Sequence, residues 1–488
     1  MAAGAAWVIL QRLAVRVIGL ASTLILVRLL VPADFGIVAL ATAFSTGLDV
    51  IMELGFDFAL INERDAKRER YDAAWTLSVL RGLLVGGLLA GAAWPLAQFY
   101  GDPRLFEVML WLGLAFFLSG LQNIGVVDFR KDFRLDKEFS LLVWSKVISF
   151  AVTIALAWIW RDYRALVIGI LVNKSASVIL SYTMHPFRPR LRFAGIGGFL
   201  HFSKWLMVVN LVNLVNARVD RVILGKMAGT ASVGIFSVAH EISTLATTEL
   251  IWPIARALFP GYAKIAAEPQ KLAPAFLDAT GLIMLLAAPI TAGIALMAEP
   301  IVRIALGPDW LAAIPVIQIL ALYGFLDMPT ANVKALFLAL GRPDLVAWRD
   351  IPSAVVLVPA LIAGATLAGA VGAAWALVAS AAVTFIVAFA FLRRSIAVGV
   401  TDIMRVCWRP FVAALLMGGA VMGLDMRAPD ASTLLLLAET VVRGLFGAAI
   451  YIAACLGLWW LSGRPAGAEA SVVAFAAAKC GFLPRKPA

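Results

Sequence analysis

The sequence predicts an all-α polytopic membrane protein with about fourteen transmembrane helices. Hydrophobic residues make up 62% of the 488-residue chain and charged residues only 15%, and the mean hydropathy is +0.92. These values lie far outside the range of soluble globular proteins. The apolar residues also come in blocks of about 20, the length at which a helix crosses the ~30 Å hydrocarbon core of a bilayer. Blocks of this length indicate helices rather than barrel strands.

The first apolar block, "ILQRLAVRVIGLASTLILVRLL" (residues 9–30), runs through a short turn into a second block and shows no cleavage site. We therefore expect it to be retained as a helix rather than removed as a signal peptide. The predicted spans are centred near Gly19, Thr46, Gly86, Phe116, Phe150, Asn173, Leu211, Glu241, Leu286, Leu322, Val355, Val378, Leu416 and Phe446.

The orientation in the membrane follows from the charges of the short loops. The loops 62–72, 128–138 and 186–193 together hold eleven Lys and Arg residues. The alternating loops around Pro32, Pro103 and Asp162 hold only four. By the positive-inside rule the basic loops are cytoplasmic. An even number of spans then places both termini on the cytoplasmic side. The +11 net charge is spread over loops and helices, which argues against a nucleic-acid-binding domain.

A weak internal repeat divides the chain into two halves. "RLLVPADFGIVALA" (28–41) after the first span is followed about 200 residues later by "RVILGKMAGTASVGIFSVA" (221–239) after the seventh. Two six-helix halves with the same order imply a pseudo-two-fold arrangement, as in transporters that rock one half against the other. The expected division is an N-terminal six-helix bundle (1–185), a cytoplasmic linker (186–197), a C-terminal six-helix bundle (198–395), two extra transmembrane helices (400–463) and a cytoplasmic tail (464–488).

"GLLVGGLLAG" (82–91) in the third span has the spacing of small residues that permits close helix approach. It predicts a tight helix pair.

Many charged residues lie inside the predicted helices, where an Arg or Lys near the bilayer centre costs ~2.5–3.5 kcal/mol. Arg12 and Arg16 share one face of the first helix because they are four residues apart. The other intramembrane bases that we single out are Arg81, Lys146, Lys174, Arg218 and Lys334. The intramembrane acids include Asp49, Glu53, Glu241 and Glu249.

Two interpretations of these charges stay open. The acids of the second and eighth helices could simply neutralise the bases of the first and seventh. That interpretation leaves Arg81, Lys146, Lys174 and Lys334 unexplained, because none has an acid within one helical turn in the sequence. A shared hydrated basic chamber for an anionic ligand explains them together. Asn210, Asn213 and Asn216 of the seventh span are expected to form hydrogen bonds between helices or to contact the ligand.

The stretch "VRLLVPADFGIVALATAF" (27–44) resembles the signature of the polysaccharide transporter family, the Wzx-type lipid-linked oligosaccharide flippases of bacteria. "YDAAWTLSVLRGLL" (71–84) followed by "LAQFYGDPRL" (96–105) resembles a second hallmark of the same group. The resemblance implies two six-helix bundles with two extra C-terminal helices, in the superfamily that also contains drug antiporters and lipid II flippases.

The resemblance also implies a function: moving undecaprenyl-diphosphate-linked oligosaccharide repeat units from the cytoplasmic to the periplasmic leaflet, for exopolysaccharide or O-antigen (lipopolysaccharide) synthesis. It implies a flippase in the bacterial inner membrane, not an enzyme, with no cofactor and no metal. Its partners would be the lipid bilayer, the lipid-linked substrate, and a polysaccharide polymerase and glycosyltransferases. By analogy, the substrate-binding candidates are Arg12, Arg16, Arg81, Lys146, Lys174, Arg218 and Lys334, and the ion-coupling candidates are Asp49, Glu53, Glu241 and Glu249.

Two rival functions are weighed against this one. A cation-coupled multidrug antiporter of the same superfamily should have an acidic chamber, whereas the intramembrane charges without a nearby acid are basic here. A membrane polysaccharide polymerase or ligase should have a long outer loop that carries catalytic groups. The sequence shows neither such a loop nor a nucleophile motif or metal-ligand cluster.

Overall fold

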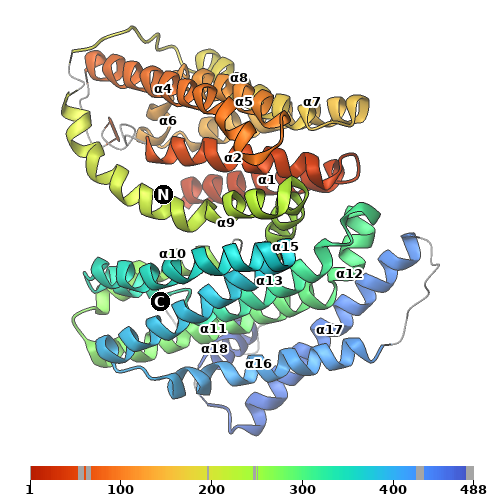
Figure 1. The fold of residues 1–488 in the computed structure, drawn as a ribbon. Helices are drawn as coiled ribbons and strands as arrows, with labels where there is room; N and C mark the ends of the chain where they lie inside the picture. The colour runs from red at the N-terminus through yellow and green to blue at the C-terminus, as the bar shows by residue number, and fades with distance from the viewer. Residues whose placement is uncertain are drawn as a thin grey trace. The chain divides into compact units, whose positions relative to one another are not determined.

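The structure is a computed structural model that describes residues 2–52, 60–61, 67–194, 197–245, 249, 251–424, 433–465 and 467–479. Its regular elements over these residues are all helical, which confirms the predicted all-α class. Eleven of the described helices are long and apolar enough to cross a membrane, or twelve if one bent pair counts as a span. The chain forms two compact units, Met1–Ser237 (unit 1) and Val238–Ala488 (unit 2) (Figure 1).

Unit 1 is built from long helices that pack in neighbouring pairs. Helix α4 lies along α5, α7 lies along α8, and α1 packs against α7 (Figure 1). The helices are α1 (Ala2–Leu26), α2 (Pro32–Ile51), α4 (Arg68–Tyr100), α5 (Arg104–Gly120), α6 (Asp128–Lys131), α7 (Leu135–Trp160), α8 (Arg164–Met184) and the first part of α9 (Gly197–Ser243).

Unit 2 contains the end of α9 and the remaining helices. Its central helix α11 packs against α13 and α16, and α16 packs against α17. The helices are α10 (Trp252–Ile265), α11 (Pro269–Leu296), α12 (Ala298–Ile301), α13 (Ala313–Asp327), α14 (Val333–Ala339), α15 (Pro343–Ile396), α16 (Val400–Met422), α17 (Thr433–Leu461) and α18 (Ala468–Lys479). Helices α16 and α17 occupy the segment expected to hold the two extra transmembrane helices.

Helix α15 is interrupted, and this matters for the number of spans. It covers 54 residues, and a straight helix of that length would measure about 80 Å, far more than the ~30 Å hydrocarbon core. Ala368 and Gly369 leave the helical conformation, and the backbones of Gly364 and Gly372 touch, so the chain turns back on itself there. Helix α9 has a similar break at Gly229. The total of fourteen spans stays a prediction.

Unit 1 extends to Ser237 and thus includes most of α9. The division into two six-helix bundles with a linker at 186–197 stays a prediction. Most of α9 belongs to unit 1 because it makes a close contact with α2. A Cβ atom at Gly36 would collide with the backbone carbonyl of Thr230, and one at Gly234 would collide with that of Pro32. Because both positions are glycine, the two backbones can touch, and this part of α9 packs into unit 1.

Helix α18 of the C-terminal segment packs into unit 2. It contacts α11 and α17. The guanidinium of Arg409 on α16 donates two hydrogen bonds to the carboxylate of Glu469, at 2.7 and 3.2 Å, and both residues are buried. Removing one partner of such a buried bidentate ion pair destabilises a protein by several kcal/mol. It therefore fixes α18 onto the bundle.

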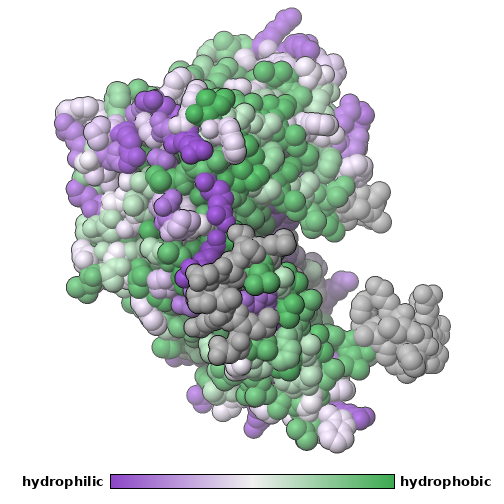
Figure 2. Space-filling view, turned by 90° about the vertical axis from the view of Figure 1, so that its right-hand side faces the viewer, coloured by the Kyte–Doolittle hydropathy of each residue, from purple (hydrophilic) through white to green (hydrophobic). Residues whose placement is uncertain are grey.

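The outer surface fits a lipid environment. Figure 2 shows one face on which hydrophobic residues cover wide areas and hydrophilic residues gather in separate patches. Large apolar side chains are exposed along the long helices, among them Leu83, Trp94, Ile159, Leu445 and Ile452. Such surfaces are unfavourable in water and suited to hydrocarbon.

The predicted tight helix pair is confirmed for α4 and α5. A Cβ atom at Gly86 would lie 2.7 Å from the carbonyl oxygen of Gly113, and one at Gly82 would lie 3.0 Å from the Cα of Gly120. Gly87, the next residue on α4, has no neighbour within 4 Å of its Cβ position. The small residues of this stretch therefore serve the contact only on one face of the helix.

This contrast gives a matched pair of variants. Gly86→Ala should lower the free energy of unfolding by about 1–3 kcal/mol because its methyl group forces the α4 and α5 backbones apart. Gly87→Ala should raise it slightly, since alanine is the better helix former by about 1 kcal/mol. Thermal unfolding in detergent would measure both. Equal midpoints for the two variants would contradict the packing described for α4 and α5.

Candidate functional site

A polar cavity of about 430 Å³ lies inside unit 1. Its walls come from α4, α5, α7 and α8, from Asp49 of α2, and from the break that follows α5. The polar side chains that line it belong to Asp49, Ser78, Arg81, Ser119, Gln122, Asn123, Arg130, Glu138 and Lys174. These include three basic and two acidic groups, so the lining carries one net positive charge.

One wall of the cavity is a sharp break in the chain. Helix α5 ends at Gly120, and the next helical stretch, Ile124–Lys131, is bent from it by 70°. Asn123, fully buried, stabilises the break: its side-chain oxygen accepts a hydrogen bond from the backbone N–H of Gly125, at 3.0 Å. The Asn123 amide nitrogen donates to the carbonyl of Phe187, at 2.7 Å. A single side chain thus satisfies backbone groups that the break would leave without partners.

Asn123 also holds the extended segment 185–193, which we call the strap because it runs across α4. The backbone N–H of Arg190 donates to Asp72, at 2.9 Å, and that of Arg192 donates to Thr76, at 2.8 Å. The two donors are two residues apart in an extended segment, a distance of about 6.6 Å. The two acceptors are four residues apart on a helix, a rise of about 6 Å, so the spacing of donors and acceptors matches. The strap is therefore fixed along α4 beside the cavity wall.

Arg81 and Asp49 form an ion pair across the cavity. The guanidinium Nη2 of Arg81 donates to Oδ1 of Asp49 at 2.9 Å, and the two side chains are 21% and 30% exposed. Arg81 has no acid within one helical turn in the sequence, yet it has an acidic partner in the structure. The partner comes from another helix, and sequence proximity cannot reveal it.

Lys174 of α8 lies in the same cavity, but the groups around its charge differ from those around Arg81. Its ammonium group is 5.1 Å from the centre of the Phe116 ring, a cation–π contact. Among the residues that the structure describes, no carboxylate lies within ion-pair distance of it, although Asp49 and Arg81 are both close enough to act on its charge. The cavity thus contains a cation whose charge is not neutralised by a direct partner.

A second ion pair closes the rim of the cavity. Nε of Arg130 donates to the Glu138 carboxylate at 2.6 Å. Arg130 and Glu138 come from the loop 128–138, whose basic residues predict the orientation of the chain in the membrane. Their spacing of eight residues gave no sign that they pair or that they reach a cavity.

The seven predicted substrate-binding residues do not all meet in this cavity. Arg81 and Lys174 line it. Lys146 is half-buried on α7, one turn beyond the cavity-lining Leu142. Of the two α1 residues, Arg12 is exposed and Arg16 is half-buried.

The remaining predicted residues lie elsewhere. Arg218 is half-buried on α9, where Asp220 and Arg221 act on its charge, and Lys334 is exposed on α14 of unit 2. Among the ion-coupling candidates, Asp49 lines the cavity, whereas Glu241 and Glu249 are half-buried in unit 2. Glu53 lies outside the described residues, as do the side chains of Asn210, Asn213 and Asn216.

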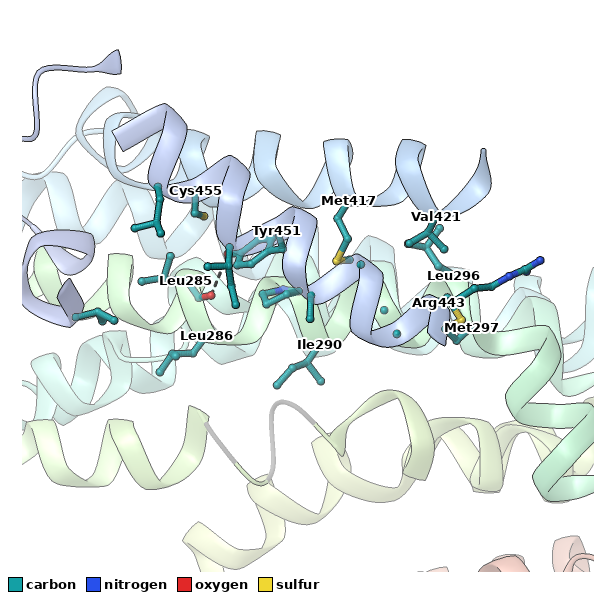
Figure 3. Close-up of a pocket in the computed structure, with 18 of the residues that line it drawn as sticks. Leu285, Leu286, Ile290, Leu296, Met297, Met417, Val421, Arg443, Tyr451 and Cys455 are labelled. Atoms are coloured by element: carbon teal, nitrogen blue, oxygen red, sulfur yellow. Dashed lines mark hydrogen bonds between the residues drawn. The ribbon is translucent and has the colours of Figure 1, made fainter. Parts of the chain in front are cut away.

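A second cavity, also about 430 Å³, lies in unit 2 and is apolar (Figure 3). Leu285, Leu286 and Ile290 of α11 form one wall, and α16 and α17 contribute others. The Tyr451 hydroxyl donates to the Leu285 carbonyl at 2.9 Å, the contact drawn in Figure 3. This lining suits hydrocarbon, and it offers few groups that could recognise a polar headgroup.

These helices and the polar cavity define a multi-pass membrane protein with a transporter fold, and comparison with known proteins gives the family. The chain belongs to the family described as "Polysaccharide biosynthesis protein", whose model matches residues 25–315. This confirms the resemblance noted in the sequence. The matched region contains all of the cavity-lining residues.

Characterised relatives cover most of the chain at low identity. The teichuronic acid biosynthesis protein TuaB of Bacillus subtilis is 23% identical over 87% of this chain and 88% of its own length. The lipopolysaccharide biosynthesis protein WzxC of Escherichia coli is 24% identical over 76% of each chain. The succinoglycan biosynthesis transport protein ExoT of Rhizobium meliloti is 25% identical over 80% of each.

Solved structures support the fold. The lipid II flippase MurJ in an inward closed conformation matches with a TM-score of 0.74 and 14% identity, covering 93% of this chain and all of that one. An inward-facing multidrug resistance transporter of the MATE family matches with a TM-score of 0.57 and 18% identity, covering 78% of this chain and 94% of that one. At these identities the matches establish the architecture and not the substrate.

Lys174 and Arg81 should respond to substitution with opposite signs. Lys174→Met should stabilise the protein by up to about 3 kcal/mol, because it removes a charge held in a membrane bundle without a direct counter-charge. Arg81→Met should destabilise it by about 1–3 kcal/mol, because it leaves Asp49 without its partner while both groups stay partly solvated. Thermal unfolding in detergent measures both shifts, with Lys334→Met as an exposed control. A loss of stability in Lys174→Met would show that its charge is compensated.

His185 at the start of the strap makes the cavity wall sensitive to acid. Burial lowers the pKa of His185 below 6.5, helped by Lys137 and Arg188 and opposed by Asp128 and Asp132. Its Nδ1 accepts a hydrogen bond from the backbone N–H of Phe187, at 3.2 Å, which only the neutral ring can do.

Because of His185, the free energy of unfolding should decrease at acidic pH. Above about pH 6.5 both the folded and unfolded states hold a neutral ring, and this residue contributes no pH dependence. As the pH falls below that value the unfolded state binds the proton first, so the free energy of unfolding decreases. Unfolding midpoints measured between pH 8 and pH 5 should fall less steeply for His185→Gln than for the wild type. Equal slopes would show that His185 does not titrate differently on folding.

Proposed function

We propose that this chain is a flippase that translocates undecaprenyl-diphosphate-linked oligosaccharide repeat units from the cytoplasmic to the periplasmic leaflet by alternating access, for exopolysaccharide or O-antigen synthesis. The observation that carries this proposal is the polar cavity with a net positive lining inside a membrane-spanning unit. The Lys174 ammonium and the Arg81 guanidinium are the groups in that cavity that suit a diphosphate.

The relatives support the choice of substrate class. Their names refer to teichuronic acid, lipopolysaccharide and succinoglycan biosynthesis, and ExoT is named as a transport protein. The common element of these names is a polysaccharide made by the cell. The fold shared with the lipid II flippase MurJ is consistent with a lipid-linked form of such a polysaccharide.

The physical chemistry of the proposed substrate fits the cavity. A sugar headgroup cannot cross hydrocarbon without leaving its polar groups unsatisfied, so it needs a polar path. The lipid tail can stay in the bilayer if that path opens sideways. A diphosphate that moves outward across an inside-negative membrane gains ~2.3 kcal/mol per charge per 100 mV. The membrane potential therefore assists the transport direction that we propose.

We assign the diphosphate contact to Arg81 and Lys174. In this proposal the other basic candidates, Arg12, Arg16, Lys146, Arg218 and Lys334, serve the substrate at other points of its path. The acids Asp49, Glu53, Glu241 and Glu249 are the proposed ion-coupling residues, and Asp49 is placed best for it because its partner Arg81 would also be drawn toward the phosphate.

The charge of the cavity separates this function from its nearest rival. A multidrug antiporter for organic cations requires an acidic or aromatic chamber, because cations bind to carboxylates and to ring faces. The cavity in unit 1 carries one net positive charge, and its two acids are both engaged by arginines. We therefore favour an anionic substrate.

The proposed location is the bacterial inner membrane with both termini in the cytoplasm, as the basic loops indicate. In that location the substrate would be delivered by glycosyltransferases on the cytoplasmic side. A polysaccharide polymerase would consume it on the periplasmic side.

A deletion strain tests the proposed function. Loss of the gene should cause a lipid-linked repeat unit to accumulate on the cytoplasmic leaflet, and the wild-type gene should clear it. The composition of the accumulated lipid would identify the sugar. A deletion strain without any such accumulation would refute the proposal.

Variants then connect the function to the cavity. Lys174→Met should fail to clear the accumulated lipid even though it folds at least as well as the wild type. Lys271→Met is a control, because Lys271 is exposed and forms an ion pair with the surface residue Glu268. Full clearance by Lys174→Met would show that the substrate does not bind at Lys174.

A further inference from the structure

One carboxylate of unit 2 lies in a place that the proposed function does not use. Asp327 is the last residue of α13, and the chain then forms a short 3-10 turn, Met328–Thr330, before α14 resumes the span. The segment Ala313–Ala339 is a single membrane-spanning stretch, so the helix is interrupted inside it. Met328, Pro329 and Thr330 are buried.

The interruption is held in place by hydrogen bonds, so it is a built feature. The Thr330 hydroxyl donates to the Asp327 carbonyl, at 3.1 Å. Fully buried Asn332 donates to the hydroxyl of Tyr262, at 3.0 Å, and to that of Thr280, at 3.4 Å. Discontinuous membrane helices place backbone carbonyls and the negative ends of half-helices where a cation or proton can bind.

Asp327 has no basic partner in this position. The charged groups that act on it are Arg349 and Asp350, both on α15. Nε of Arg349 is already engaged by the carboxylate of Asp350, at 2.8 Å. Among the described residues, no Lys, Arg or His nitrogen lies within 4.0 Å of the Asp327 carboxylate. The three charged groups would carry one net negative charge if Asp327 were ionised.

Two other carboxylates of unit 2 form direct ion pairs with arginines. Glu439 pairs with Arg443, and Glu469 pairs with Arg409. An ionised carboxylate in an apolar environment without such a partner costs several kcal/mol, and it avoids that cost by keeping its proton. An intramembrane acid of this kind is a typical element of a proton pathway.

We propose that Asp327 is a proton-binding site that couples transport to the proton gradient. This inference rests on the proposed flippase function. The carboxylic acid releases its proton toward the cytoplasm and takes up another from the periplasmic side, and no other bond changes. The inward proton and the outward diphosphate both move in the direction that an inside-negative potential favours. Coupling would then involve a residue of unit 2, while the phosphate is held in unit 1.

Infrared spectroscopy of the purified protein tests the protonation without any substrate. A protonated carboxyl group has a C=O stretch that is distinct from the bands of a carboxylate. At neutral pH the wild type should show such a band, and Asp327→Asn should lose it. Asp278→Asn is the matched control, because Asp278 is an exposed acid of the same unit, and this variant should keep the band. An unchanged band in Asp327→Asn would overturn the proposal.

Reconstituted vesicles test the coupling. The probe is the lipid-linked repeat unit isolated from the deletion strain, and its distribution between leaflets is measured with and without an imposed pH gradient. With one proton per substrate, a gradient of about one pH unit should change the steady-state ratio about tenfold in the wild type. Asp327→Asn should abolish this response, and Asp327→Glu, which keeps a carboxyl group, should retain it.

The two proposals fail in different ways. If the wild type moves no lipid-linked repeat unit in any condition, the flippase function is wrong, and the infrared result still decides the protonation of Asp327. If the wild type moves the lipid but ignores the pH gradient, or if Asp327→Asn keeps the full response, the coupling role is wrong and the flippase function stands.

Discussion

The cost of a charge in an apolar environment is the constraint on which the arrangement of this protein depends. Several acids of the helix bundles are paired with an arginine, as in Arg81–Asp49, Arg409–Glu469 and Arg443–Glu439. The first two pairs tie together different helices, whereas Arg443 and Glu439 are four residues apart on α17. Lys174 and Asp327 depart from this pattern, one a base in unit 1 and the other an acid in unit 2. Where a fold tolerates such a cost, a functional reason is the best explanation.

Pairing also explains why the site is hard to see from the sequence. Composition and block length were enough to predict the membrane class, and the glycines of residues 82–91 correctly predicted a tight contact. Neither tells which acid an arginine will meet, because Arg81 and Asp49 come from different helices. Arg81 and Lys174 both lack an acid within one helical turn in the sequence, yet only Arg81 is seen to form an ion pair among the described residues. Distances between helices decide this, and a sequence pattern does not contain them.

Other residues of the site could not be identified from the sequence. Asn123 is a single amide in a short polar stretch, yet it shapes the break after α5 and holds the strap. Asp72 and Thr76 resemble ordinary polar residues at the start of a helix, and only the extended strap beside them gives them a role. The residues that bind backbone in this way have no charge pattern and no motif. Asp327, by contrast, was visible in the sequence as an acid in a span, but its missing partner was not.

The touching glycines of α2 and α9 bear on how relatives of this protein can be classified. Gly36 belongs to the stretch by which the sequence resembles its family, and Gly234 belongs to the repeated counterpart of that stretch. The recognisable motif thus records how two backbones fit together. Proteins that share it inherit a common scaffold. The side chains that select the glycan of each protein must lie outside this motif. Membership of the family and the identity of the transported glycan are therefore separate questions.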